Sequence, residues 1–294
     1  MMFDLVASGV FQRALLGGTA AAVMAALVGY FLVLRAQAFA AEAFLDICFA
    51  GATGAGLLGQ APLLGMIVFS LFSALSLGAL GERARGRSVE IGMVLSFALG
   101  LGVLFLGVSA RSSGSHANAA VAVLFGSMLS IQWKDILRMC ISGAAALATL
   151  AVVFRPLLFA SIDPTGARAR GLPVRMLSIV FLLVVALAAS ASTLVVGVLL
   201  SVSLLIAPAA AAVQLTRRPV RSILLSVLLA LGVTWGGLLV SFVGTWHPPI
   251  GFAISTLSAL VYFAAVLVGR RGRARRVQEI RDLDREVRGN GRSP

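Results

Sequence analysis

Residues 176–214 read MLSIVFLLVVALAASASTLVVGVLLSVSLLIAPAAAAVQ and carry no charged side chain. A helix needs about 20 mostly apolar residues to cross the hydrocarbon core of a bilayer. The stretch is therefore long enough for two crossings, at 176–193 and 195–214, with a turn near Ser190–Thr193. Backbone amides find no water inside a bilayer, so each crossing must satisfy its own hydrogen bonds as a helix. This stretch predicts an all-α membrane protein.

Seven further apolar runs have a similar length and are separated by Gly, Pro or charged residues. They cover residues 14–34, 38–58, 62–80, 90–109, 137–157, 222–243 and 252–268. The apolar run at 119–130 is too short to cross and predicts a re-entrant segment, which needs protein around it at membrane depth. We therefore expect a polytopic protein of about eight to nine transmembrane helices plus a re-entrant segment. Residues 1–268 form the transmembrane domain, and the basic tail, 269–294, is expected to be disordered because it lacks apolar periodicity.

The composition indicates lipid as the solvent for most of the chain. Of the 294 residues, 60% are hydrophobic and 12% are charged, whereas soluble domains are about half apolar and a quarter charged. The sequence has no GxxxxGK[ST] phosphate-binding loop, and its two histidines lie beside turns, which argues against ATP hydrolysis and a Ser-His-Asp triad. The two cysteines form no CxxC pair, so no thiolate zinc site is indicated. We expect a membrane protein that is not an enzyme and has no permanently bound cofactor.

The positive charges mark one side of the membrane. The chain has 24 Lys and Arg against 11 Asp and Glu, a formal net charge of +13. The arginines concentrate in alternate connections between spans: Arg35; Arg83, Arg85 and Arg87; Arg168, Arg170 and Arg175; Arg217, Arg218 and Arg221; and the tail. Cytoplasmic loops carry such an excess, so nine spans would place the N-terminus outside and the C-terminus in the cytoplasm. The charge thus indicates orientation and contact with lipid headgroups, and it does not indicate a nucleic-acid partner.

Two acidic residues, Glu42 and Asp46, lie inside a predicted span. A carboxylate within a membrane is energetically costly and commonly marks an ion path. The i, i+4 spacing places both on one helix face, where they repel each other unless a cation or a shared proton lies between them. Because oxygen ligands suit hard divalent cations, Glu42 and Asp46 are the candidate metal ligands. Alternatively, they lie close to the cytoplasmic end of the span and pair with a loop arginine.

The connection 161–175 has the pattern of a short, arginine-rich helix. Asp163-Pro164 is a typical helix start, and Gly171-Leu172-Pro173 is a typical helix stop. Together with Arg168, this pattern indicates a docking element for a soluble partner. Composition alone also allows an ordinary connection between two spans.

Five stretches occur in an order and at a spacing typical of one family. They are Phe11–Arg35, Ser88–Gly92, Leu124–Ser127, Asp163-Pro164 with Gly171-Leu172-Pro173, and Gly197–Ala211. Through them the chain resembles the permease subunit of bacterial ABC transporters for zinc, manganese or iron(II), over residues 11 to 268. The last of the five stretches resembles the most recognisable signature of that family.

The resemblance implies a homodimeric, multi-pass permease in the bacterial cytoplasmic membrane, or a permease paired with a similar subunit. An extracytoplasmic metal-binding solute receptor would deliver a divalent cation, the transported substrate, to the path at Glu42 and Asp46. Separate ATP-binding cassette ATPase subunits would supply the energy. The resemblance places their contact on one loop of this chain, at Asp163, Pro164, Arg168, Gly171 and Pro173.

The chain departs from the family in its second helix. The family usually has an acidic residue, a His four positions later and then a Gly, and here Glu42, Asp46 and Gly51 take those places. His247 stands near an outer turn where the family often has Asp. Since imidazole suits Zn²⁺ and carboxylates suit Mn²⁺, the departure favours Mn²⁺ or another hard ion over Zn²⁺.

Two other functions fit the same residues. A secondary cation transporter or channel could use Glu42 and Asp46 without ATP. An inverted repeat would favour that function, and we find no convincing one in the sequence. A non-transporting membrane scaffold would need neither carboxylate.

Overall fold

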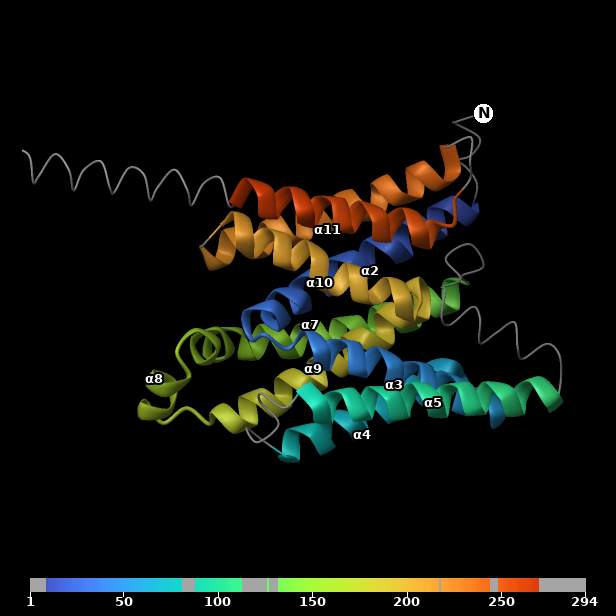
Figure 1. Cartoon of the computed structure of the whole chain (residues 1–294), viewed down its shortest axis with the longest axis horizontal. Helices are drawn as coiled ribbons and strands as arrows, with labels where there is room; N and C mark the ends of the chain where they lie inside the picture. Colours follow the sequence, from blue (N-terminus) through green and yellow to red (C-terminus); the bar gives the residue numbers. More distant parts are fainter. Residues whose placement is uncertain are drawn as a thin grey trace, which may run out of the picture.

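The structure, a computed structural model, describes residues 9–80, 88–112, 126, 132–216, 218–243 and 248–269. Within these residues the chain is almost wholly helical and has no strand. The helices are α2 (Gly9–Leu34), α3 (Ala38–Leu57), α4 (Pro62–Leu80), α5 (Ser88–Ser112), α7 (Trp133–Ile162), the short α8 (Pro164–Ala169), α9 (Val174–Val196), α10 (Val198–Leu215), α11 (Pro219–Val243) and a last helix at Ile250–Gly269. The long helices lie side by side in one bundle (Figure 1).

The expected all-α, multi-pass architecture is confirmed. Eight of the described helices are long and apolar enough to cross a membrane, and α4 contributes a shorter apolar segment, Pro62–Gly78. Each of the nine predicted spans corresponds to one of these helices. Of the expected re-entrant segment, 119–130, the structure describes Gly126 alone, and the basic tail beyond Gly269 lies outside the described residues.

The turn between α9 and α10 lies later than the sequence pattern indicates. The pattern favours a turn near Ser190–Thr193, whereas α9 continues to Val196 and the chain turns at Gly197. Gly197 has a φ of 88°, a left-handed conformation that a residue without a Cβ adopts at little cost. Ser190 is accommodated inside the helix because its hydroxyl donates a hydrogen bond to the carbonyl of Ala186, one turn earlier. The polar side chains of this run therefore lie in a fully buried stretch of α9.

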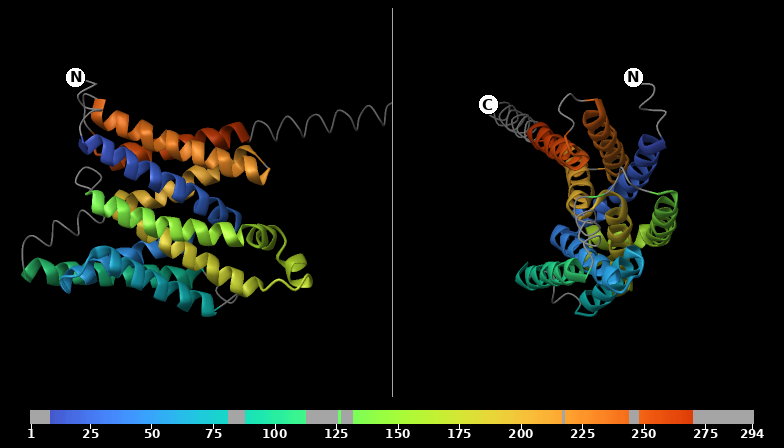
Figure 2. Two further views of the ribbon diagram at one scale, coloured as in Figure 1. Left: turned by 180° about the vertical axis from the view of Figure 1, so that it is seen from behind. Right: turned by 90° about the vertical axis from the view of Figure 1, so that its right-hand side faces the viewer.

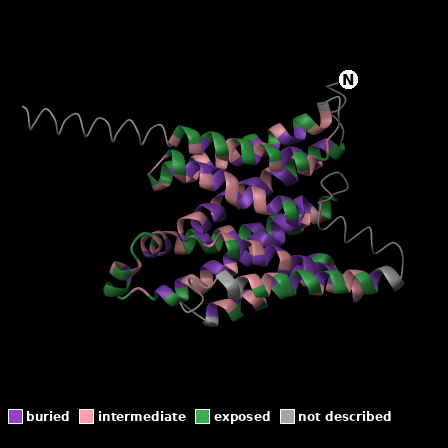
Figure 3. Ribbon diagram, viewed as in Figure 1, coloured by how far each residue is buried: buried purple, intermediate pink, exposed green. Residues whose placement is uncertain are grey.

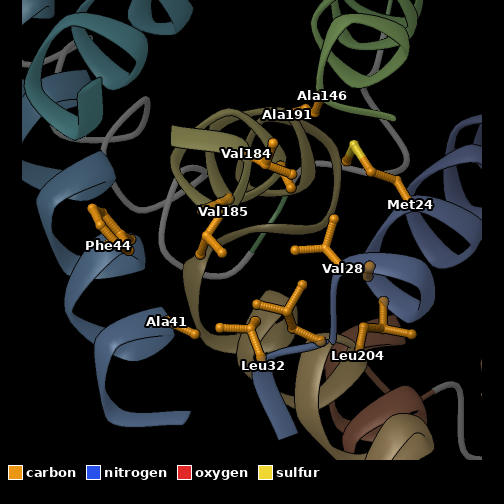
Figure 4. Packing of buried hydrophobic residues seen from close by; sticks show 14 of the residues in the cluster. Met24, Val28, Leu32, Ala41, Phe44, Ala146, Val184, Val185, Ala191 and Leu204 are labelled. Carbon is orange, nitrogen blue, oxygen red and sulfur yellow. The ribbon is translucent and has the colours of Figure 1, made fainter. Parts of the chain in front are cut away.

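The core is built around α9. Figure 4 shows side chains of α2, α3, α7 and α10 meeting those of α9. The labelled residues are Met24, Val28 and Leu32 (α2), Ala41 and Phe44 (α3), Ala146 (α7), Val184, Val185 and Ala191 (α9), and Leu204 (α10), all of them buried. Small residues at such contacts let membrane helices approach closely. This packing fixes one side of α3, the helix that carries Glu42 and Asp46.

The outer helices expose large apolar side chains. Met93 and Phe97 of α5, and Phe252 and Phe263 of the last helix, are each more than half exposed. Figure 3 shows exposed residues along the outer helices and buried residues along the centre of the bundle. Such a surface would be unfavourable in water, but the acyl chains of lipid are as apolar as these side chains. The exposed surface is that of a multi-pass membrane protein.

The helices α3 and α4 touch through their backbones at Gly51 and Gly65. A Cβ on Gly51 would lie 2.7 Å from the carbonyl carbon of Gly65, and a Cβ on Gly65 would lie 2.7 Å from the carbonyl carbon of Gly51. Both distances are too short for real atoms, and backbone atoms cannot swing aside as a flexible side chain can. The two glycines therefore set the spacing between α3 and α4.

The variant Gly65→Ala is expected to destabilise the protein by about 1–3 kcal/mol, the usual cost of overpacking, because α3 and α4 must separate. The control is Gly56→Ala on the facing helix α3, where nothing lies within 4 Å of an added Cβ. The measurement is the thermal unfolding midpoint of each purified variant in detergent. Equal midpoints for the two variants would contradict the close approach of the helices.

The described arginine-bearing connections lie at one end of the bundle. The α2–α3 turn at Arg35, the helix α8 and the α10–α11 connection at Arg218 are on the left in Figure 1 and on the right in the rear view of Figure 2. We call this the α8 end. The α3–α4 turn at Gln60 and the α9–α10 turn at Gly197 lie at the opposite end. This grouping is the one that the positive-inside rule requires.

Candidate functional site

Glu42 and Asp46 are the two partly exposed residues in a stretch of α3 that is otherwise buried. Every other residue from Ala40 to Thr53 is buried, whereas these two are partly exposed. Phe39, three residues before Glu42, is 64% exposed and lies on the same face of the helix. The rest of α3 packs against α4, α5, α9 and α10. The two carboxylates thus lie with Phe39 on the one face of α3 that other helices leave partly exposed, and we call this face the open stripe of α3.

Neither carboxylate forms an ion pair with an arginine of the described residues. The ion pair found in that part of the chain joins Arg138 to Asp135 at 3.5 Å, near the start of α7. Arg35, the nearest preceding arginine, donates hydrogen bonds to Ser161 and Ser178. The expected alternative, in which a loop arginine neutralises the pair, therefore finds no support in the described residues. A cation or a shared proton between the two carboxylates would relieve their repulsion.

Glu42 and Asp46 by themselves are too few to hold a metal ion. The described residues contain no group of three or more His, Cys, Asp or Glu that could hold a metal ion. Oxygen-ligated Mn²⁺ prefers six ligands, so an ion bound by Glu42 and Asp46 would need water or another chain to complete its shell. An incomplete set of this kind suits a cation that binds and then leaves.

A buried polar cluster, which the sequence analysis missed, lies on the other side of α3. The Sγ of Cys48 is 3.4 Å from the Oγ of Ser190, and that oxygen is 2.9 Å from the Oγ of Ser70. All three residues are fully buried, and they join α3, α9 and α4. Cys48 follows Asp46 by two residues, about 200° around the helix, so the cluster faces away from the carboxylates. The sequence signal for it is a serine inside each of two apolar spans.

A pocket of about 380 Å³ opens between α3, α4 and α5. Its lining includes Gly54, Leu58, Leu64 and Phe105 and is almost wholly apolar. The pocket lies toward the end of α3 that is remote from Glu42. It therefore offers no ligand set for a cation.

The helix α8 begins at a capped N-terminus. The Asp163 carboxylate accepts hydrogen bonds from the amide of Gly166 at 2.9 Å and from the hydroxyl of Thr165 at 2.8 Å, and Pro164 occupies the first turn. These hydrogen bonds, that of Gly166 first, hold the pKa of the Asp163 carboxyl below its ordinary value. The cap is therefore charged at neutral pH, and it is lost only when the pH falls through that lowered pKa.

The helix α8 ends in a Schellman turn. The amide of Gly171 donates to the carbonyl of Arg168, and the amide of Leu172 donates to the carbonyl of Ala167. Gly171 has a φ of 76°, which disfavours any residue with a Cβ. Pro173 then precedes the first residue of α9. The short helix expected from the Asp-Pro and Gly-Leu-Pro patterns is confirmed.

The outward face of α8 is basic. Ala167 is buried toward the bundle, whereas Arg168 and Arg170 are exposed. The guanidinium of Arg170 lies 5.0 Å from the centroid of the Phe159 ring of α7, a cation–π contact that steadies the side chain. A capped helix that presents fixed positive charge can serve as a docking element for an acidic groove.

The bundle of long apolar helices, with two partly exposed carboxylates in one of them, is that of a polytopic membrane protein. The chain belongs to the ABC 3 transport family, which matches it over residues 8–269.

The chain is similar to several membrane subunits of metal transport systems. The manganese transport system membrane protein MntC of Listeria innocua is 26% identical over 270 residues, which cover 90% of this chain and 92% of that protein. The chelated iron transport system membrane protein YfeD of Yersinia pestis is 29% identical over 249 residues, 82% of either chain. The solved structure of PsaBC from Streptococcus pneumoniae in complex with Fab matches with a TM-score of 0.78 and 26% identity, over 90% of this chain and 93% of that chain. The resemblance to the permeases of metal-uptake ABC transporters is confirmed.

Proposed function

We propose that the chain is the membrane-spanning permease of an importer for a divalent metal cation, and that Glu42 and Asp46 line the path of that cation. The observation that supports the proposal is that these two carboxylates are partly exposed, whereas the other residues of α3 from Ala40 to Thr53 are buried. Two carboxylates among apolar helices, without an arginine partner in the described residues, are costly for a protein that only spans the membrane. A passing cation offsets that cost.

The ligand type favours Mn²⁺ as the cargo. Both candidate ligands are carboxylates, which suit hard cations, whereas Zn²⁺ prefers nitrogen or sulfur ligands. The names of the relatives in manganese and iron transport systems support the same class of cargo. Fe²⁺ is the second candidate, because it accepts oxygen ligands as well.

The proposed transporter contains more than this chain. A second copy faces the open stripe of α3, so that four carboxylates surround the path. ATP-binding cassette ATPase subunits dock on α8 and supply the energy, with Asp163, Pro164, Gly171 and Pro173 shaping the element and Arg168 contacting the partner. A metal-binding solute receptor delivers the cation at the opposite end of the bundle.

The test is cation uptake into liposomes that contain the permease together with its cognate ATPase and solute receptor. The expected result is ATP-dependent uptake of radiolabelled Mn²⁺ that requires the receptor. Uptake driven by an ion gradient without ATP would favour the secondary transporter or channel. No uptake of Mn²⁺, Fe²⁺ or Zn²⁺ under any of these conditions would leave the scaffold as the function.

The α8 end is expected to face the cytoplasm. In a background lacking Cys48 and Cys140, single substitutions Ala169→Cys and Gln60→Cys place thiols at exposed positions at opposite ends of the bundle. An impermeant thiol reagent added to intact cells should label the Gln60→Cys variant, and should label the Ala169→Cys variant only after lysis. Labelling of the Ala169→Cys variant in intact cells would reverse the orientation.

A further inference from the structure

Arg35 is a buried arginine at the α8 end of the bundle, with 8% of its surface exposed. Its Nη2 donates a hydrogen bond of 2.6 Å to the Oγ of Ser178, and its Nη1 donates one of 3.4 Å to the Oγ of Ser161. The guanidinium also lies 5.2 Å from the centroid of the Phe181 ring. A buried guanidinium is retained only where several partners compensate for its lost hydration.

The two serines belong to the helices on either side of the docking helix. Ser161 lies in the last turn of α7, and Ser178 lies in the second turn of α9. Each hydroxyl donates to a carbonyl of its own helix, Ser161 to Leu157 and Ser178 to Val174. Each oxygen is thereby oriented to accept from Arg35. The guanidinium therefore connects both ends of the segment that contains α8.

The backbone around Arg35 is a tight turn that leads directly into α3. The amide of Ala36 donates to the carbonyl of Val33, and the amide of Gln37 donates to the carbonyl of Leu32, which is a Schellman turn. Ala36 takes the left-handed position with a φ of 53°. Because α3 starts at Ala38, few free torsions separate Arg35 from the helix of Glu42 and Asp46.

An aromatic cluster also joins α2, α7 and α9 close to Arg35. The Phe31 ring of α2 lies 5.5 Å from the Phe154 ring of α7 and 6.3 Å from the Phe181 ring of α9, measured between centroids. The same three helices thus meet below Arg35 through close-packed rings. A shift of the ends of α7 and α9 must either move the α2–α3 turn or break the hydrogen bonds of Arg35.

We propose that Arg35 is the positioning residue that transmits movement of α8 to the cation path. When the docked ATPase displaces α8, the ends of α7 and α9 pull on the guanidinium, and the α2–α3 turn passes the displacement to Glu42 and Asp46. Arg35 itself touches neither the cation nor the ATPase in this scheme. The inference rests on the proposed function, because it requires that ATP hydrolysis drives cation movement.

The test is the number of cations transported per ATP hydrolysed in the reconstituted complex. A misfolded fraction lowers the rate of transport and the rate of ATP hydrolysis together and leaves this ratio unchanged. The ratio therefore distinguishes a loss of coupling from a loss of folded protein. Arg35→Gln is expected to lower the ratio about tenfold, the size of a typical coupling between sites, while the ATPase still co-purifies. Arg35→Lys keeps the charge but cannot hold both serines in a fork, and should recover part of the ratio.

A second pair of variants tests the link without removing the charge. The double substitution Ser161→Ala/Ser178→Ala removes both acceptors, and it is expected to lower the ratio as Arg35→Gln does. Ser142→Ala is the matched control, since that buried serine of α7 lies 19 residues before Ser161 and donates to the carbonyl of Met139 in its own helix. If both Arg35→Gln and the double variant transport as many cations per ATP as the wild type, the inference about Arg35 is wrong, while the proposed function still stands. Absence of ATP-dependent uptake by the wild type would overturn the proposed function, and the inference with it.

Discussion

The double variant Glu42→Gln/Asp46→Asn is expected to lose metal uptake completely while it still folds and inserts. The two amides keep the size and shape of the side chains but remove the negative charges that a divalent cation requires. Removing two intramembrane charges should also ease insertion, so expression should be equal to or higher than that of the wild type. Loss of transport without loss of expression is the pattern that a cation path predicts.

The measurement is receptor-dependent uptake of radiolabelled Mn²⁺ at matched amounts of permease. Asp135→Asn is the control, because Asp135 is a carboxylate in the first turn of α7 that pairs with Arg138 and lies at the other end of the bundle. This control should transport normally. Wild-type uptake by the double variant would remove Glu42 and Asp46 from the path.

The variant Asp46→His extends the same prediction to the choice of metal. It restores the acidic-then-His spacing of the family and places a nitrogen ligand one turn from Glu42. Because imidazole is the better donor for Zn²⁺, uptake should shift toward Zn²⁺ when Zn²⁺ and Mn²⁺ compete. An unchanged preference would mean that another part of the transporter selects the cation.

The variant Gly171→Val is expected to abolish stable association with the ATPase subunits. Gly171 holds a φ of 76° at the end of α8, and a β-branched residue there costs about 1–3 kcal/mol in backbone strain. The short α8 has few other interactions with which to resist that strain, so its Schellman turn should open. The basic face of Arg168 and Arg170 would then lose its fixed shape.

The measurement is co-purification of the ATPase with tagged permease from the membrane. Gly59→Val is the matched control, because Gly59 also has a left-handed φ, 66°, and open space around an added Cβ, but lies in the α3–α4 turn at the opposite end. Both variants carry comparable strain, and only the α8 variant should lose the partner. Equal recovery of the ATPase with the two variants would show that α8 is not the docking element.

The sequence by itself determined the class of the protein. Long apolar runs such as 176–214 indicate that most of the chain lies in lipid. Inside a bilayer, a chain with runs of this length satisfies its backbone hydrogen bonds as helices. The short helix α8 was predictable for a local reason, since Asp163-Pro164 and Gly171-Leu172-Pro173 encode its two ends within a few residues. The carboxylates stood out because charge is rare in an apolar span.

The position of the α9–α10 turn was not predictable in the same way. Ser190 and its polar neighbours look like loop residues. The Ser190 hydroxyl is nevertheless satisfied inside the helix, because it donates to the carbonyl of Ala186 one turn earlier. Gly197, the residue that takes the left-handed φ, looks in the sequence like any other small residue of the signature. Its role depends on how α10 folds back beside α9.

Only the tertiary structure decided which face of α3 is open and what Arg35 does. The i, i+4 spacing places Glu42 and Asp46 together, but their neighbours from Ala40 to Thr53 are buried because α4, α5, α9 and α10 happen to cover the other sides. Arg35 contacts Ser161 and Ser178, which lie 126 and 143 residues away in the chain. Local sequence carries no record of such contacts, because they depend on where distant helices pack.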